Sequence, residues 1–249
     1  MIAILSPAKQ MRSDPDSLEA RGRPRFLEES RILLGRLREL PLPQLRELLA
    51  CSEKLARQAF DRFREMDLDR GPVTPALLAY VGIQYQYMMP GAFTDGELDY
   101  VQDHLRILSG FYGVLRPLDG VLPYRLEMQA RLPEGPHRSL YAFWGDALAQ
   151  ALEQEAGGVL LNLASEEYAR AVRPHLGAGT RWITPVFGQL EGGRVREKGV
   201  YVKMARGEMA RFLAEGRIQG PRELPAFSRL GFRFAPELST PDSPVFLKK

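Results

Sequence analysis

The chain of 249 residues contains a single cysteine, Cys51, and only three histidines. One cysteine excludes an intramolecular disulfide and is typical of proteins of the reducing cytoplasm. The histidines lie far apart, at positions 104, 137 and 175, so the sequence lacks the Cys and His spacing of a zinc site. We therefore expect neither a resident metal ion nor another cofactor.

Long apolar runs are absent as well. No stretch approaches the roughly 20 apolar residues that a membrane-spanning helix needs. The first residues, Met1–Pro7, are too short and uncharged for a secretory signal and instead predict a first strand. These features predict a cytoplasmic protein without a membrane partner.

Several catalytic motifs are missing. The sequence contains no G-x-G-x-x-G, G-x-x-x-x-G-K-[ST], H-E-x-x-H, C-x-x-C or G-x-S-x-G pattern, which disfavours Rossmann dehydrogenases, nucleotide-dependent kinases and zinc hydrolases. Lysine is scarce, since only six of the 34 basic residues are lysines, at positions 9, 54, 198, 203, 248 and 249. The net charge of +3 and the pI of about 9.0 indicate an anionic partner only weakly.

Short apolar runs alternate with helical periodicity along the chain. The predicted strands are residues 2–5, 158–163, 181–187 and 199–203, with additional edge strands at 232–234 and 245–248. The predicted helices are residues 26–40, two helices within 44–66, a buried helix over 76–89, a helix that opens at the Thr94 capping box, and helices over 140–155 and 205–215. This order predicts a mixed α/β (α+β) fold with a central mixed sheet and flanking helices. Without repeats or a clear linker, residues 1–249 are expected to form one domain.

A glycine-containing hairpin is the most distinctive local feature. The run Leu105–Asp119, LRILSGFYGVLRPLD, is predicted to begin as a helix and to turn at Gly110 and Gly113. Such a Gly-x-x-Gly turn exposes backbone N–H groups that can hold a phosphate. We therefore predict a helix-hairpin-helix-like element over about 97–118, with phosphate or nucleic-acid contacts from Arg106, Ser109, Gly110, Tyr112, Gly113 and Arg116.

This run also has a structural interpretation. Gly110 can be a helix C-cap and Gly113 a turn residue, and Pro117 would shorten a second helix. Phe111 and Tyr112 can stack on exposed bases, or they can anchor the core.

Two further cations follow or lie within predicted strands. Lys9 ends the segment Ser6-Pro-Ala-Lys, and ligands of open α/β sheets bind beyond the carboxyl ends of strands. It can face an anion there or lie exposed in a turn. Arg125 and Glu127 would share one face of a strand, either as an internal ion pair or as part of a site.

Two predicted strand-to-helix junctions complete the set of candidates. Asn162 and Ser165 can receive an anion at a helix N-terminus, or they can serve as capping and turn residues. Lys203 and Arg206 lie three residues apart on one helix face, beside Gly207. They predict a phosphate site if an anion lies nearby, and a solvated basic face if none does.

Six segments together resemble the YaaA family of bacterial peroxide-stress proteins. They are residues 4–9 (ILSPAK), 105–119 (LRILSGFYGVLRPLD), 123–128 (PYRLEM), 140–146 (LYAFWGD), 162–168 (NLASEEY) and 203–212 (KMARGEMARF). The resemblance implies a cytoplasmic protein induced in oxidative stress and linked to lowering free intracellular iron. It also implies DNA binding through a positively charged cleft, on an unusual fold with a helix-hairpin-helix element.

The sequence departs from the family pattern at four positions. Val81 replaces a lysine, Ile83 replaces an aspartate, Tyr87 stands where a glycine is usual, and Met204 replaces a second lysine. A polar role at the first three positions is therefore not expected here. The basic cluster at Lys203 and Arg206 is weaker by one charge.

Three functions remain open at this point. The first is a non-enzymatic protein that binds duplex or distorted DNA through a basic cleft. The second is an enzyme that acts on a nucleobase, nucleoside or DNA lesion, with lysine as nucleophile and a carboxylate that handles protons. Its candidate catalytic residues are Lys9, Lys203, Asp119 and Glu127. The third, direct sequestration of iron, is disfavoured by the lack of a Cys and His cluster.

Overall fold

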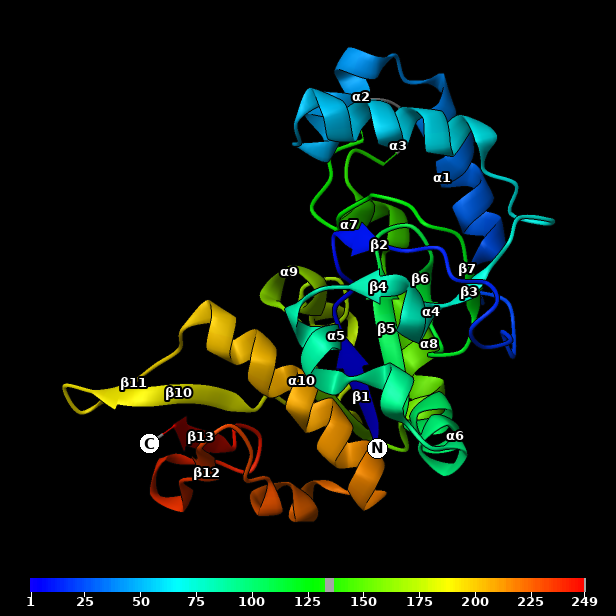
Figure 1. Cartoon of the computed structure of the whole chain (residues 1–249). Helices are drawn as coiled ribbons and strands as arrows, with labels where there is room; N and C mark the ends of the chain where they lie inside the picture. The colour runs from blue at the N-terminus through cyan, green and yellow to red at the C-terminus, as the bar shows by residue number, and fades with distance from the viewer. Residues whose placement is uncertain (133–136, 249) are drawn as a thin grey trace.

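The computed structural model describes residues 1–132 and 137–248. Its largest sheet has five strands in the order β6-β5-β1-β8-β9 (Figure 1). These strands are β1 (Ile2–Leu5), β5 (Leu105–Ser109), β6 (Gly113–Leu115), β8 (Val159–Leu163) and β9 (Arg181–Ile183). All neighbours are parallel except β5 and β6. The predicted mixed α/β class and central mixed sheet are therefore confirmed.

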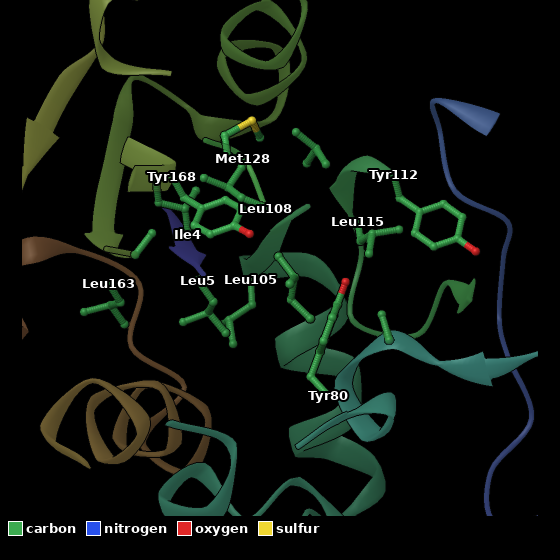
Figure 2. Packing of buried hydrophobic residues seen from close by; sticks show 14 of the residues in the cluster. Ile4, Leu5, Tyr80, Leu105, Leu108, Tyr112, Leu115, Met128, Leu163 and Tyr168 are labelled. Atoms are coloured by element: carbon green, nitrogen blue, oxygen red, sulfur yellow. The ribbon is translucent and has the colours of Figure 1, made fainter. Parts of the chain in front are cut away.

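Strand β1 lies in the middle of this sheet and is completely buried. Ala3 pairs with Leu105 on one side and with Leu161 on the other. A parallel strand covered on both faces needs a continuous apolar sequence, and Ile-Ala-Ile-Leu supplies it. Figure 2 shows Leu5, Leu105 and Leu163 from three neighbouring strands within one buried cluster. Helices α6 (Asp95–His104) and α8 (Ala147–Ala156) both contact β1.

The glycine run is a β-hairpin, so the predicted helix-hairpin-helix-like element over 97–118 is wrong. Helix α6 opens at the Thr94 capping box as predicted, but it ends at His104, and Leu105 adopts an extended backbone. Residues 105–109 then form β5, which pairs with β6 across a turn at residues 110–112. A short apolar run fits a buried strand as well as a buried helix, and here pairing with β1 decides between them.

Helices α1 (Leu27–Glu39), α2 (Leu42–Leu49) and α3 (Glu53–Glu65) lie together at one end of the molecule, far from the second sheet (Figure 1). They confirm the three helices predicted over 26–66. Between α2 and α3 the chain turns through Ala50, which has a left-handed backbone, and Ser52, which accepts a hydrogen bond from the backbone of Leu55. Two helices are thus joined by a three-residue turn.

A second sheet holds the C-terminal part of the chain, with strands β11 (Arg194–Arg196), β10 (Val186–Glu191), β13 (Val245–Lys248) and β12 (Phe232–Phe234) in that order. The strand predicted over 181–187 is divided, because β9 belongs to the first sheet and β10 to the second. Strand β12 is an edge strand as predicted, whereas β13 lies inside the sheet. Phe187 packs against Phe227, Phe232 and Phe246 at centroid distances of 5.4–5.8 Å.

Helix α10 (Gly199–Gly216) crosses between the two sheets in Figure 1. The strand predicted over 199–203 is wrong, because these residues form the first turns of α10. Val202, Ala205, Met209 and Leu213 are buried at helical spacing, and this longer period overrides the local alternation of Val-Tyr-Val-Lys.

Two other predicted helices are interrupted. Residues 76–89 form α4 (Ala76–Ala79), β4 (Tyr80–Val81) and α5 (Ile83–Met88), and residues 140–155 divide into α7 (Leu140–Trp144) and α8 at Gly145, whose φ is +51°. The remaining elements are β2 (Gln10–Met11), which pairs with β4, β3 (Thr74–Pro75), which pairs with β7 (Gly120–Val121), α9 (Glu166–Ala169), and the 3-10 turns η1 (Pro90–Ala92), η2 (Arg173–His175), η3 (Pro221–Ala226) and η4 (Pro236–Leu238). None of the helices in the described part of the chain combines the length and the apolar character needed to cross a bilayer.

Candidate functional site

A site forms where β1 and β8 end at the same edge of the sheet. Ser6 follows β1, and Ser165 follows β8 as the N-cap residue of α9. The backbone N–H of Ser165 donates to Ser6 Oγ at 2.8 Å, so the two strand ends are tied together. From β1 the chain reaches β5 on one side and later β8 on the other, and ligands of open α/β sheets bind at such a switch point.

A cavity of about 460 Å³ opens beyond these strand ends. Its charged lining comes from four segments that are remote in sequence. Four cations and two carboxylates line it: Lys9, Arg125, Lys203, Arg206, Glu127 and Glu167. Because cations outnumber carboxylates, the cavity attracts an anion.

Lys9 and Arg125 share one carboxylate. Lys9 Nζ lies 2.8 Å from Glu127 Oε2, and an Arg125 terminal nitrogen lies 3.2 Å from Glu127 Oε1. Arg125 and Glu127 are mostly buried, whereas the Lys9 side chain is 65% exposed. Arg125 and Glu127 thus form an ion pair that lines the cavity.

Among the residues that the structure describes, the two cations of α10 have no carboxylate partner of this kind. Lys203 and Arg206 both line the cavity, as their spacing on one helix face predicts. Burial lowers the pKa of the Arg206 guanidinium, and the charge of Glu197 opposes the shift. Within the described residues, the buried Nε atoms of Arg206 and Arg125 have no hydrogen-bond partner. Both guanidinium groups line the cavity, where their other nitrogens can donate to a bound anion.

Gly207 sets the position of these cations rather than contacting a ligand. A Cβ atom there would overlap the backbone oxygen of Gln84 in α5. The glycine lets α10 approach α5 closely, and Gln84 and Tyr85 of α5 line the same cavity. The close backbone approach that this glycine permits is therefore an approach of two helices.

Glu167 and Tyr124 complete the wall. Burial raises the pKa of Glu167, and the negative charge of Glu127 adds to the shift. Burial likewise raises the pKa of Tyr124 to about 12. The Tyr124 hydroxyl lies 2.7 Å from Ser109 Oγ and 2.9 Å from the Tyr80 hydroxyl, so a chain of buried hydroxyl groups leads from the wall into the core.

The hairpin residues proposed to contact phosphates or bases are in the core. Phe111 and Tyr112 are 0% and 1% exposed, so the prediction that they can stack on exposed bases is wrong. Ser109 Oγ accepts hydrogen bonds from the backbone N–H groups of both residues, which removes these groups from any phosphate. Figure 2 shows Tyr112 among the buried side chains.

Close packing leaves no room for a side chain at either hairpin glycine. A Cβ atom at Gly110 would overlap the backbone oxygen of Leu126. Gly113 has a φ of +74°, and a Cβ atom there would press on Phe26 and Trp144. The structural interpretation of this run is therefore the correct one.

Asn162 is a capping residue rather than a cavity residue. It is buried and accepts a hydrogen bond from the backbone N–H of Ala164. Ser165, the other candidate of this junction, does line the cavity.

Three remaining candidates lie elsewhere, near the amino end of β5. Arg106 is 3% exposed and bonds Glu155 through Nε at 2.7 Å. Arg116 and the buried Asp119 line the same hollow, which shares no lining residue with the cavity. Asp119 is consequently not placed to work with Lys9, whereas Glu127 is.

Two departures from the family pattern also belong to the cavity wall. Val81 and Ile83 line it, so an apolar surface stands where the family pattern has a lysine and an aspartate. Sequence reasoning missed Glu167 and Tyr85, although Glu167 lies inside the motif 162–168. The available signal was an acid in the first turn of the helix that follows a strand. Among residues 1–132 and 137–248, no three His, Cys, Asp or Glu side chains come together as a metal-binding group.

The fold and the cavity define a mixed α/β protein with a cation-lined pocket at the carboxyl ends of the parallel strands β1 and β8. A family model for the peroxide stress protein YaaA matches residues 1–238. A UPF0246 protein of Desulfitobacterium hafniense is 50% identical over 248 residues, covering 100% of this chain and 98% of that protein. A UPF0246 protein of Pediococcus pentosaceus is 45% identical, again with 100% and 98% coverage, and one of Lactiplantibacillus plantarum is 45% identical with 99% of each chain covered. The chain belongs to the YaaA family of peroxide stress proteins.

Proposed function

We propose that this protein binds DNA in the cytoplasm during peroxide stress, through a basic cleft whose deepest part is the cavity. The observation that carries the proposal is the meeting of Lys9, Arg125, Lys203 and Arg206 at one cavity, where these cations outnumber the two carboxylates. Phosphate oxygens are the acceptors that such groups prefer.

The size of the cavity supports a preference for distorted DNA. A volume of about 460 Å³ is in the range of small-molecule sites and is too small for a duplex. Backbone phosphates would contact the cations at the rim, and one unstacked nucleotide would enter. Unstacking costs least where the bases are already unpaired, so bubbles and single strands should bind more tightly than plain duplex.

We propose that helices α2 and α3 form the helix-hairpin-helix element that the resemblance implies. These helices are joined by the turn at Ala50–Ser52, and the first turn of α3 is exposed. Its free backbone N–H groups and Lys54 can hold a phosphate. This contact would add affinity without sequence preference.

A second function rests on a specific contact in the same cavity. Lys9 Nζ and Glu127 Oε2 are 2.8 Å apart, which is the arrangement a lysine-dependent glycosylase or lyase needs for a nucleophile and a proton acceptor. An enzyme that acts on a damaged nucleotide is therefore the alternative. We also propose that the protein contributes to lowering free iron in the cell, as the resemblance implies.

The test is fluorescence-anisotropy titration of matched 30-mers as plain duplex, bubbled duplex, nicked duplex and single strand. The double variant Lys203→Gln/Arg206→Gln should weaken binding at least about tenfold. Its control, Arg194→Gln/Arg196→Gln, removes the same charge from exposed positions of β11 and should change binding less than about threefold.

Products are analysed on a denaturing gel in the same experiment. Strand cleavage or base loss that Lys9→Ala abolishes would favour the enzyme. Failure of the unmodified protein to bind any of these DNAs at low salt would contradict DNA binding.

A further inference from the structure

A second hollow near the amino end of β5 is also rich in cations. It has a volume of about 400 Å³ and is lined by five arginines but only two carboxylates, Asp119 and Glu155. The arginines are Arg21, Arg23, Arg25, Arg106 and Arg116. We call this region the arginine hollow.

One carboxylate in the arginine hollow serves three guanidinium groups. Glu155 binds the buried Arg106 through Nε at 2.7 Å, and its other oxygen lies 3.4 Å from Arg116 and 3.8 Å from Arg25. Although burial alone would raise the pKa of Glu155, the hydrogen bond and charge of Arg106 and the charge of Arg116 lower it. Because Arg106 takes most of this carboxylate, Arg25 and Arg116 keep largely uncompensated charges.

The remaining arginines form a row. The backbone N–H of Arg21 donates to Leu118, and the oxygen of Gly22 accepts from Gly120, so this segment runs along the main body in an extended form. Alternate residues of an extended chain face the same way, about 7 Å apart. Arg21 and Arg23 belong to this extended stretch and Arg25 to the turn that follows it, and all three line the arginine hollow, where they can meet successive groups of a linear polyanion.

These side chains are open to solvent. Arg21, Arg23, Arg25 and Arg116 are 42–57% exposed. The carboxylates that pair with Arg21 and Arg23 are Asp99 and Asp69, 64% and 56% exposed. Exposed pairs of this kind contribute little stability, so an incoming phosphate can replace them.

We infer that the arginine hollow is a second binding site, for the phosphate chain of a nucleic-acid backbone. Guanidinium groups bind phosphate oxygens in a bidentate manner, which suits a row of them to a chain of phosphates. The identification of the ligand as a nucleic acid rests on the proposed function, since a free polyphosphate offers the same chemistry. The site itself lies away from the cavity and is tested separately.

The first arm of the test measures how DNA binding depends on salt. The variant Arg21→Gln/Arg23→Gln/Arg25→Gln is compared with Arg194→Gln/Arg196→Gln/Arg222→Gln, which removes the same charge from exposed positions elsewhere. If the row contacts phosphates, the slope of log K against log salt should fall in magnitude by about three for the first variant and by less than one for the control. Equal slopes for the two variants would overturn the inference wherever the unmodified protein binds DNA.

The second arm uses inorganic tripolyphosphate and calorimetry, and it needs no DNA. The row variant should lose at least about tenfold in affinity, while Lys203→Gln/Arg206→Gln should keep a binding event of unchanged affinity. If the protein binds no DNA but binds tripolyphosphate through the row, the second site is supported and the proposed function is contradicted. Tripolyphosphate binding that is absent or indifferent to the row would overturn the site. Thermal unfolding confirms that each variant is folded.

Discussion

The cavity and the arginine hollow both collect cations, but they neutralise them in different ways. In the cavity, Glu127 pairs with Lys9 and Arg125, and the uncompensated charge belongs to the α10 cations Lys203 and Arg206, of which Arg206 is half-buried. In the arginine hollow, the buried cation Arg106 is neutralised, and the uncompensated charge belongs to exposed side chains. The cavity is suited to select one enclosed group, and the hollow to contact a long polyanion.

This difference follows from the elements that build each region. The cavity cations stand on α10 and on the segments after β1 and β7, and two of them, Arg125 and Arg206, are partly or mostly buried. The row of the hollow stands on a loop, so its arginines keep their rotamer freedom until a ligand orders them. Rigid, partly buried donors favour specificity, whereas exposed and mobile charges favour salt-dependent affinity.

The largest loss of stability is expected for a substitution at Gly207, which shapes the cavity but not the hollow. Gly207→Ala would force its Cβ atom into the backbone of α5 and push α10 away, at a cost of about 3 kcal/mol or more. Urea unfolding measures the loss, and DNA binding should weaken with it. Gly199→Ala, on the same helix where a Cβ atom meets nothing within 4 Å, is the control. A loss below about 1 kcal/mol for Gly207→Ala would contradict the close helix contact.

A slightly smaller loss of stability is expected for a substitution at Glu155, which lines the hollow but not the cavity. Glu155→Gln leaves the buried Arg106 without its negative partner and should lower the free energy of unfolding by about 2–3 kcal/mol. The same change frees Arg25 and Arg116, so affinity for tripolyphosphate should rise. Glu191→Gln, which loses only the half-exposed pair with Lys198, should cost less than about 0.5 kcal/mol. If both variants cost the same, the hollow is not organised around Glu155.

Asp119 should make the stability of the hollow depend on pH. Burial raises the pKa of Asp119 to about 6, although its hydrogen bond from Arg116 and the charges of Arg116 and Arg106 oppose this. A folded-state pKa above the unfolded value means that folding favours the protonated form. Its stabilisation is complete below about pH 4 and is lost as the pH rises through 6.

Asp119→Asn removes this titration. The free energy of unfolding of the unmodified protein, relative to that of the variant, should therefore fall by about 2 kcal/mol between pH 4 and pH 7. Chemical denaturation at several pH values measures the difference. A flat difference across this range would show that Asp119 titrates normally.

The smallest effect on stability is expected at Lys9. Its side chain is 65% exposed and Glu127 keeps Arg125, so Lys9→Gln should change the free energy of unfolding by less than about 0.5 kcal/mol. DNA binding should still weaken, because a cation leaves the cavity. Unfolding and anisotropy on one preparation separate the two effects. A loss of stability without a loss of binding would make Lys9 structural.

Part of the fold could be read directly from the sequence. Buried periodicity identified β1, β8 and the three helices α1 to α3, and the pattern from Thr94 to Glu97 identified the start of α6. The hairpin could not be identified, because Leu-Arg-Ile-Leu-Ser is compatible with a buried helix until β1 lies beside it. The start of α10 was predicted wrongly for a related reason, since four alternating residues resemble a strand when the helix beyond them is ignored.

The structure brings many of the predicted site residues into two groups, and this grouping was not foreseen. Lys9, Arg125, Glu127, Ser165, Lys203 and Arg206 meet at one cavity, whereas Arg106, Arg116 and Asp119 meet at another. The alternating arginines at 21, 23 and 25 were visible in the sequence, yet a loop has no periodic signal to say which side faces the body. Pairing of this loop with residues 118–120 supplies that information.

The sequence by itself determined the family, the mixed α/β class and the residue types available for anion binding, because these depend on local pattern and motif. Only the tertiary structure decided which cations are buried and which carboxylate neutralises each of them. The reason is that burial and pairing arise between segments more than 100 residues apart, such as Lys9 and Glu127. Local sequence constrains such distances only through the completed sheet.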